Sequence, residues 1–150
     1  MPPSRKRSLK AVCCFLLLCC PLLSAQSSEE FLSDARRNYR AGSLDEAIRI
    51  YKSILERDKS SAPAHSGLVL ALLKKDDVSE AYETARRALS AVPESAAVHA
   101  ALGDVFFRKG QFADSEAEYK KALKFDGKLA RGWWGLGRVA TCVSMYKSAK

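Results

Sequence analysis

The sequence repeats itself with a fixed period of about 34 residues. When the chain is aligned with itself at this offset, leucines fall on leucines in two columns and small residues share a third. The columns are Leu55, Leu89 and Leu123; Leu68, Leu102 and Leu136; and Ala47, Ala81, Ser115 and Ala149. A fixed period of this length is typical of a solenoid, in which each unit buries its apolar face against its neighbours, rather than of a globule around one active site.

Each unit of the repeat predicts two helices. In the third unit, AAVHAALGDVFFRKG has apolar residues at helical spacing and ends at Gly110, while QFADSEAEYKKALKFDG gives a second amphipathic helix that ends at Gly127. No stretch shows the alternation of a half-buried strand, so the predicted fold class is all-α. The capping boxes expected in the first unit are Ser27 with Glu30 and Ser43 with Glu46.

The repeat resembles the tetratricopeptide repeat family, whose pattern is Trp-x-x-Leu-Gly-x-x-Tyr, then Ala-x-x-x-Phe, then Pro. The matching residues are Trp133, Leu136 and Gly137; Leu102, Gly103 and Phe106; Ala47 and Tyr51; Ser115 and Tyr119; and Pro93. The resemblance implies a right-handed α-solenoid of antiparallel helix pairs. It divides the chain into repeats at 28–62, 63–96 and 97–130 and a truncated fourth repeat at 131–150, about three and a half repeats in all.

Small residues occupy several columns of the repeat, among them Ala47, Ala81, Ser115, Gly103 and Gly137. We expect these positions where helices cross closely, because a large side chain there would force the helices apart. We interpret most of the aromatic side chains as packing between the helices.

Residues 1–27 have the layout of a secretory signal peptide. A basic start, MPPSRKRSLK, precedes the uncharged run AVCCFLLLCCPLLS and the small residues AQSS. A membrane anchor is the alternative, but the run is shorter than the ~20 residues that a spanning helix needs. We therefore expect export to a periplasm or the extracellular space, with membrane contact only through this peptide. The lack of cysteine pairs outside it favours a bacterial source.

Catalysis, metal binding and nucleic-acid binding find little support. Four of the 25 basic residues and none of the 17 acidic ones lie in residues 1–27, so the remainder carries a net charge of about +4, too mild to indicate nucleic acid. His65 and His99 are the only histidines, share one column of the repeat and have no cysteine or acid pair beside them. Cys142 has no histidine in its repeat, and no phosphate-binding glycine loop is present. We expect no enzyme activity, metal or cofactor.

The resemblance points to a groove lined by the first helix of each pair, where members of the family bind peptides. Carried over by register, the groove residues are Arg36, Tyr39, Arg40, Leu73, Lys74, Asp104, Phe107, Arg108, Trp134 and Arg138. One row is basic and an apolar row lies beside it, which suits a peptide with acidic and apolar groups. The alternative is that these charges only solvate one face.

The chain ends within its fourth repeat. Trp133, Leu136 and Gly137 keep the register, and Tyr146 would belong to a second helix that has barely begun. The uncovered surface could support self-association. We expect a non-catalytic protein-interaction scaffold; the alternative is the N-terminal repeat region of a larger secreted enzyme, with its catalytic domain beyond residue 150.

Overall fold

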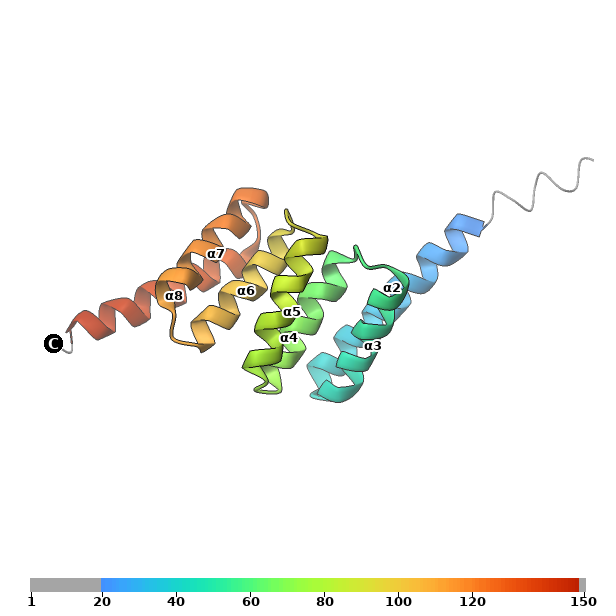
Figure 1. Cartoon of the computed structure of the whole chain (residues 1–150), viewed down its shortest axis with the longest axis horizontal. Coiled ribbons are helices and arrows are strands. Elements are labelled where there is room, and N and C mark those ends of the chain that lie inside the picture. Colours follow the sequence, from blue (N-terminus) through green and yellow to red (C-terminus); the bar gives the residue numbers. More distant parts are fainter. Residues whose placement is uncertain (1–19, 149–150) are drawn as a thin grey trace, which may run out of the picture.

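The computed structural model describes residues 20–148, with side chains from Ser28 to Tyr146 and at Ser148. Over these residues the chain forms seven helices and no strand. The helices are α2 (Cys20–Ala41), α3 (Leu44–Arg57), α4 (Ala62–Lys74), α5 (Val78–Ala91), α6 (Ala96–Arg108), α7 (Phe112–Phe125) and α8 (Ala130–Ser148). Successive helices pair and the pairs stack in one row (Figure 1), so the predicted all-α solenoid is confirmed.

The first helices of the pairs form the inner layer of the stack. Each of α2, α4 and α6 contacts the next first helix of the series, which ends with α8, and also the helix that follows it along the chain. α6 lies at the centre and buries an unbroken run from Val98 to Val105. Stacking of the first helices therefore brings equivalent positions of successive repeats onto one continuous face.

The N-terminal end of the chain departs from one expectation. Residues 1–19, which hold most of the predicted signal peptide, lie outside the described residues. Because α2 already begins at Cys20, Ser27 lies inside a helix and cannot cap its start, so the predicted capping box with Glu30 is wrong. Among the described residues, no helix combines the length and the apolar character needed to cross a bilayer.

The turn inside each complete pair is built in the same way. Gly42, Asp76 and Gly110 have φ of 85°, 72° and 73°, the left-handed region that lets a helix end with its last carbonyls satisfied. In the first turn, the N–H of Gly42 donates to Tyr39 O (3.3 Å) and that of Ser43 to Asn38 O (3.0 Å). The equivalent two bonds recur in the turns at Asp76 and Gly110, so the period seen in the sequence is a period of backbone geometry.

The N-caps differ from the predicted capping box at the second helix of the first pair. Ser43 is the N-cap residue of α3, but its side chain makes no capping bond, and Glu46 pairs instead with Arg49 at 2.6 Å. Side-chain capping is seen at Asp77, which accepts from Glu80 N, and at Ser95, which accepts from Val98 N.

The fourth repeat corrects a second expectation. α8 continues as one helix to Ser148, so Tyr146 does not belong to a separate second helix. The register would place the turn at Ser144, one period after Gly110, and the N-cap at Met145. Serine lacks the conformational freedom of glycine, and methionine offers no oxygen to cap a helix. The division of the chain into repeats stays a prediction from the sequence.

Close helix crossings occur at Gly103 but not at Gly137. A Cβ added to Gly103 would lie 2.8 Å from the Tyr119 ring of α7, whereas one added to Gly137 would meet nothing within 4 Å. The prediction for Gly137 is therefore wrong, because none of the described helices packs on this side of α8. The crossings that the sequence did not single out are at Gly67, against Tyr51, at Gly132, against Leu123, and at Gly135, against Tyr119.

Candidate functional site

The face formed by the first helices carries a chain of three hollows. One, of about 460 Å³, is lined from α2, α3, α4, α6 and α8; the next, of about 210 Å³, shares Tyr39, Leu70 and Arg131 with it. The third, of about 490 Å³, shares Trp134 and Arg138 with the second. We call this continuous surface the first-helix groove. The ten residues predicted from the register all line at least one of its three hollows.

Two arginines stand without partners at the α2 end of the groove. Arg36 and Arg40 are exposed, and neither has a hydrogen bond or an ion pair within the described part of the chain. They flank a wall made by Tyr39 and Tyr51. The pKa of Tyr51 is raised, chiefly by burial, so its hydroxyl stays neutral. This end offers guanidinium groups beside aromatic surface to a ligand.

A buried carboxylate lies at the centre of the groove. Asp104 accepts hydrogen bonds from Tyr119 Oη (2.6 Å), from Arg131 Nη1 (2.7 Å) and from Arg138 Nη1 (3.2 Å). Its side chain is only 8% exposed. Burial, and then the negative charge of Asp104, raise the pKa of Tyr119. Asp104 lines the groove, but its oxygens already have donors, so it fixes the two arginines instead of facing a ligand.

Arg138 is further held between two aromatic rings. Its guanidinium carbon lies 3.8 Å from the centroid of the Phe107 ring and 4.4 Å from that of Trp134. Such contacts attract a cation to the ring face and add to the ion pair with Asp104. Trp134 remains 60% exposed, so this end of the groove presents an aromatic surface stiffened by a buried charge pair.

The other two predicted cations connect neighbouring repeats. Lys74 Nζ donates to Tyr39 O at 2.8 Å, and Arg108 Nη1 donates to Leu73 O at 3.2 Å. Each thus reaches a last-turn carbonyl of the preceding first helix, where a cation is also favoured by the helix dipole. Arg108 pairs with Asp76 as well. Leu73 itself is buried and belongs to the core, so it offers the groove little surface.

Arg131 is a groove cation that the sequence prediction missed. It lines the first two hollows and bonds to Asp104 across α6 and α8. Its column holds Pro63 and Ala97 in the second and third repeats, so the repeat gave no sign of a cation there. A signal was present within α8, because Arg131 and Arg138 are spaced about two helical turns apart and therefore share one face of the helix.

The two histidines have structural surroundings. His99 is buried, with Nδ1 2.7 Å from Glu118 Oε2 and Nε2 2.9 Å from Pro93 O, and it stacks on Phe125. His65 lies in the first turn of α4, with Nε2 2.8 Å from Lys59 O. Within the described residues, no three histidine, cysteine or acidic side chains gather as metal ligands would.

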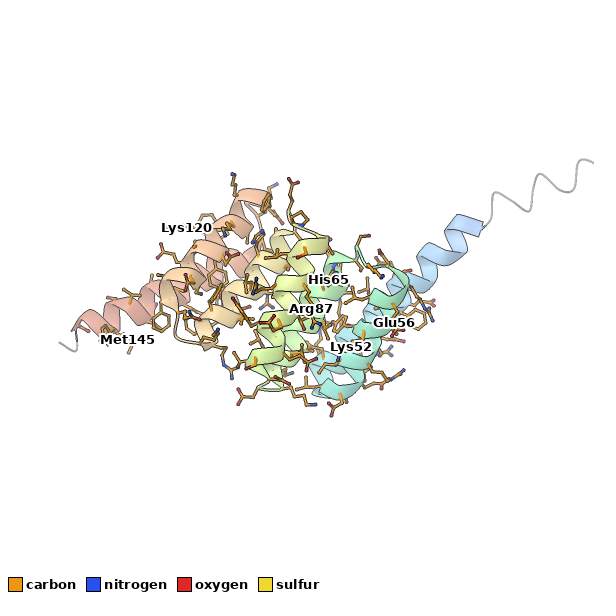
Figure 2. All side chains as sticks on the ribbon, in the orientation of Figure 1. Lys52, Glu56, His65, Arg87, Lys120 and Met145 are labelled. Carbon is orange, nitrogen blue, oxygen red and sulfur yellow. The ribbon has the colours of Figure 1, made fainter. Side chains whose placement is uncertain are left out.

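A further hollow, of about 580 Å³, opens between α3, α4 and α5. Its lining includes Lys52, His65 and Arg87, whose side chains are labelled in Figure 2. Lys52 and Glu80 form an ion pair across it at 3.3 Å. Glu80, whose side chain is 41% exposed, gives this surface an accessible negative charge, which the first-helix groove lacks because its carboxylate, Asp104, is buried.

Two family models match the chain, and both are described as tetratricopeptide repeat. One matches residues 39–104 and the other residues 100–141. No curated protein matches the sequence.

Solved structures share the fold at low sequence identity. The first TPR domain of human RPAP3 superposes with a TM-score of 0.70 at 12% identity, over 82% of this chain and 97% of that one. The first TPR of Spaghetti (RPAP3), bound to the HSP90 peptide SRMEEVD, gives 0.66 at 13% identity over 79% and 94%. The Yersinia enterocolitica type III secretion chaperone SycD, in complex with a peptide of the translocator YopD, gives 0.65 at 14% identity over 83% and 95%.

Proposed function

Because the chain belongs to the tetratricopeptide repeat family, we propose that it is a non-catalytic interaction module whose first-helix groove holds a segment of a partner protein. Two of the similar structures, those of Spaghetti and SycD, contain a bound peptide. The stacked helices offer a groove that exists before the ligand arrives, which lowers the ordering cost of binding.

The charge of the groove supports an acidic segment. Six cations line the three hollows, whereas the only carboxylate there, Asp104, is buried under two of them. The observation that carries the proposal is the pair Arg36 and Arg40, since these exposed guanidinium groups have no acidic partner among the described residues. Among the exposed cations outside the groove, Arg49 and Lys75 pair with neighbouring acids, whereas Lys124 and Lys128 form no ion pair within the described chain but stand apart from any aromatic wall of the groove.

Apolar groups of the ligand would find aromatic surface beside these charges. Tyr39 and Tyr51 flank the free arginines, and Trp134 lies farther along the groove. Arginine and aromatic side chains are the residues most often found to dominate binding energy at protein interfaces. The proposed ligand is therefore a segment with adjacent acidic residues and at least one large apolar residue.

Selection from a displayed library of short random peptides tests this proposal. We expect peptides retained by the protein to be enriched in glutamate and aspartate next to leucine or an aromatic residue, and their retention to fall as salt rises. Enrichment of basic or uncharged peptides, or no enrichment, would contradict it.

A further inference from the structure

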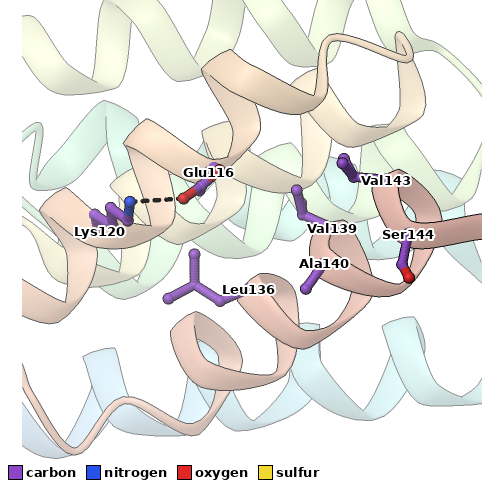
Figure 3. A pocket seen from close by; sticks show the side chains of 7 residues that line it. All are labelled: Glu116, Lys120, Leu136, Val139, Ala140, Val143 and Ser144. Atoms are coloured by element: carbon purple, nitrogen blue, oxygen red, sulfur yellow. Dashed lines mark ion pairs between the residues drawn. The ribbon is translucent and has the colours of Figure 1, made fainter. Parts of the chain in front are cut away.

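Helix α8 carries a second surface, on the side away from the groove. Leu136, Val139, Ala140 and Val143 follow the spacing i, i+3, i+4 and i+7 and line a hollow of about 420 Å³ between α7 and α8 (Figure 3). Spacing of this kind forms one apolar stripe along a helix. The stripe is only partly covered: Val139 is buried, Leu136 and Val143 are half-buried, and Ala140 is exposed.

The same positions are covered in the inner repeats. Leu68 and Leu102, the counterparts of Leu136, are each only 5% exposed; of the two counterparts of Ala140, Leu72 is 2% exposed and Phe106 is half-buried. There the second helix of the pair, α5 or α7, packs antiparallel to the first. The hollow on α8 thus lies where an antiparallel helix belongs.

We propose that a second copy of this chain fills this hollow, with its α8 antiparallel to the first. A two-fold axis perpendicular to α8 supplies an antiparallel helix of the same sequence, so each copy places its own α8 in the hollow of the other. The far end of α8 extends beyond α7 (Figure 1), and Met145, labelled there in Figure 2, is 66% exposed. This extension leaves room for a partner helix to lie alongside.

The charges of α8 favour a copy of itself over a charged partner. Residues 139–146 contain no charged side chain, so two such helices meet without like-charge repulsion. Arg138 is turned to the other side, where Asp104 and Phe107 hold it. On the rim, Glu116 and Lys120 pair with each other at 2.6 Å (Figure 3). This is the opposite of the first-helix groove, whose free cations suit an acidic ligand.

The proposed interface uses one stripe of helix from each copy. It is therefore smaller than the roughly 800 Å² per partner of a typical stable interface, and we expect a dissociation constant in the micromolar range. The small side chains of Ala140 and Ser144 allow the two helices to approach closely.

Sedimentation equilibrium of the full chain over a dilution series tests the proposal with a matched pair of variants. Ala140→Glu places a charge at the centre of the proposed interface, while Thr141→Glu places the same charge one residue on, facing the groove. Both positions are exposed in the single copy, so neither change should affect its folding.

We expect the wild type and Thr141→Glu to dimerise alike and Ala140→Glu to raise the dimer dissociation constant at least tenfold, because a buried charge would have no partner. Circular dichroism should show the same helix content in all three. A wild type that stays monomeric at high concentration, or equal association of the two variants, would overturn the proposal. Capture of a foreign helix by a monomeric chain would overturn it too.

Discussion

At the scale of single residues, one buried carboxylate orders the middle of the groove. Asp104 holds Arg131 and Arg138 from α8 and accepts the hydroxyl of Tyr119 from α7. A carboxylate buried at this depth is tolerated because both of its oxygens have donors, two of them charged. Asp104 thus links three helices and decides where two of the six groove cations point.

Replacing this carboxylate should therefore cost stability. We expect Asp104→Asn to lower the free energy of unfolding by about 1–3 kcal/mol, less than the loss of a fully buried pair because both arginines are partly exposed. Urea unfolding measures this. The exposed ion pair of Asp76 with Arg108 supplies the control, and Asp76→Asn should cost less than about 1 kcal/mol. Equal losses in the two variants would mean that Asp104 is not a structural centre.

At the scale of helices, the pairs fit together by matching large residues with small ones. Tyr51 of α3 meets Gly67 of α4, and Tyr119 of α7 meets Gly135 of α8. The intervening register pairs Ala85 with Ala101, two small residues that are both fully buried. The second helix can therefore carry tyrosine only where the next first helix carries glycine, which explains two otherwise unfavourable glycines inside helices.

A methyl group added at two glycines of α8 should have opposite effects. Gly135→Ala would place Cβ 2.2 Å from Tyr119 Cζ, and we expect it to destabilise the fold by about 1–3 kcal/mol through overpacking. Gly137→Ala meets nothing within 4 Å, and we expect a gain of up to about 1 kcal/mol from helix propensity. Thermal unfolding of both variants checks the pair. A stabilised Gly135→Ala would show that α7 does not pack this closely on α8.

The sequence predicted the helices well because the repeat sets their apolar spacing and their ends. It failed where a contact depends on what packs opposite. Gly103 and Gly137 share a column, yet only Gly103 faces a tyrosine. The prediction that Tyr146 belongs to a second helix rested on the period alone, whereas the turn before that helix also needs a residue that adopts the left-handed region readily, and Ser144 does not.

For the groove as well, the sequence predicted positions but not contacts. Register placed ten residues along one surface, since first helices that stack must align equivalent positions. It could not tell which charges are free. Lys74 and Arg108 donate hydrogen bonds to carbonyl oxygens of the preceding repeat. Arg40 makes no such bond, because the described chain has no repeat before the one that contains it. Hydrogen bonds between neighbouring repeats depend on how the repeats stack in the folded chain, so a single sequence does not reveal them.

At the scale of the whole molecule, the stack presents two surfaces of different character. The first-helix groove combines free arginines with tyrosine and tryptophan side chains, while the outer stripe of α8 is uncharged. Electrostatic attraction acts at the first surface and apolar burial at the second. The two proposed interactions, with an acidic segment and with a second copy of the chain, would therefore use separate surfaces.

The most direct test is fluorescence anisotropy with a labelled peptide that contains two adjacent glutamates between leucine and phenylalanine. We predict that Arg36→Glu with Arg40→Glu weakens its binding at least tenfold, because like charges replace the free guanidinium groups, and that the double variant gains affinity for the same peptide with lysine in place of glutamate. Lys124→Glu with Lys128→Glu makes the same change in net charge away from the groove and should leave binding within about twofold of the wild type. Equal weakening in the two double variants, or unchanged binding in the first, would contradict the assignment of the groove.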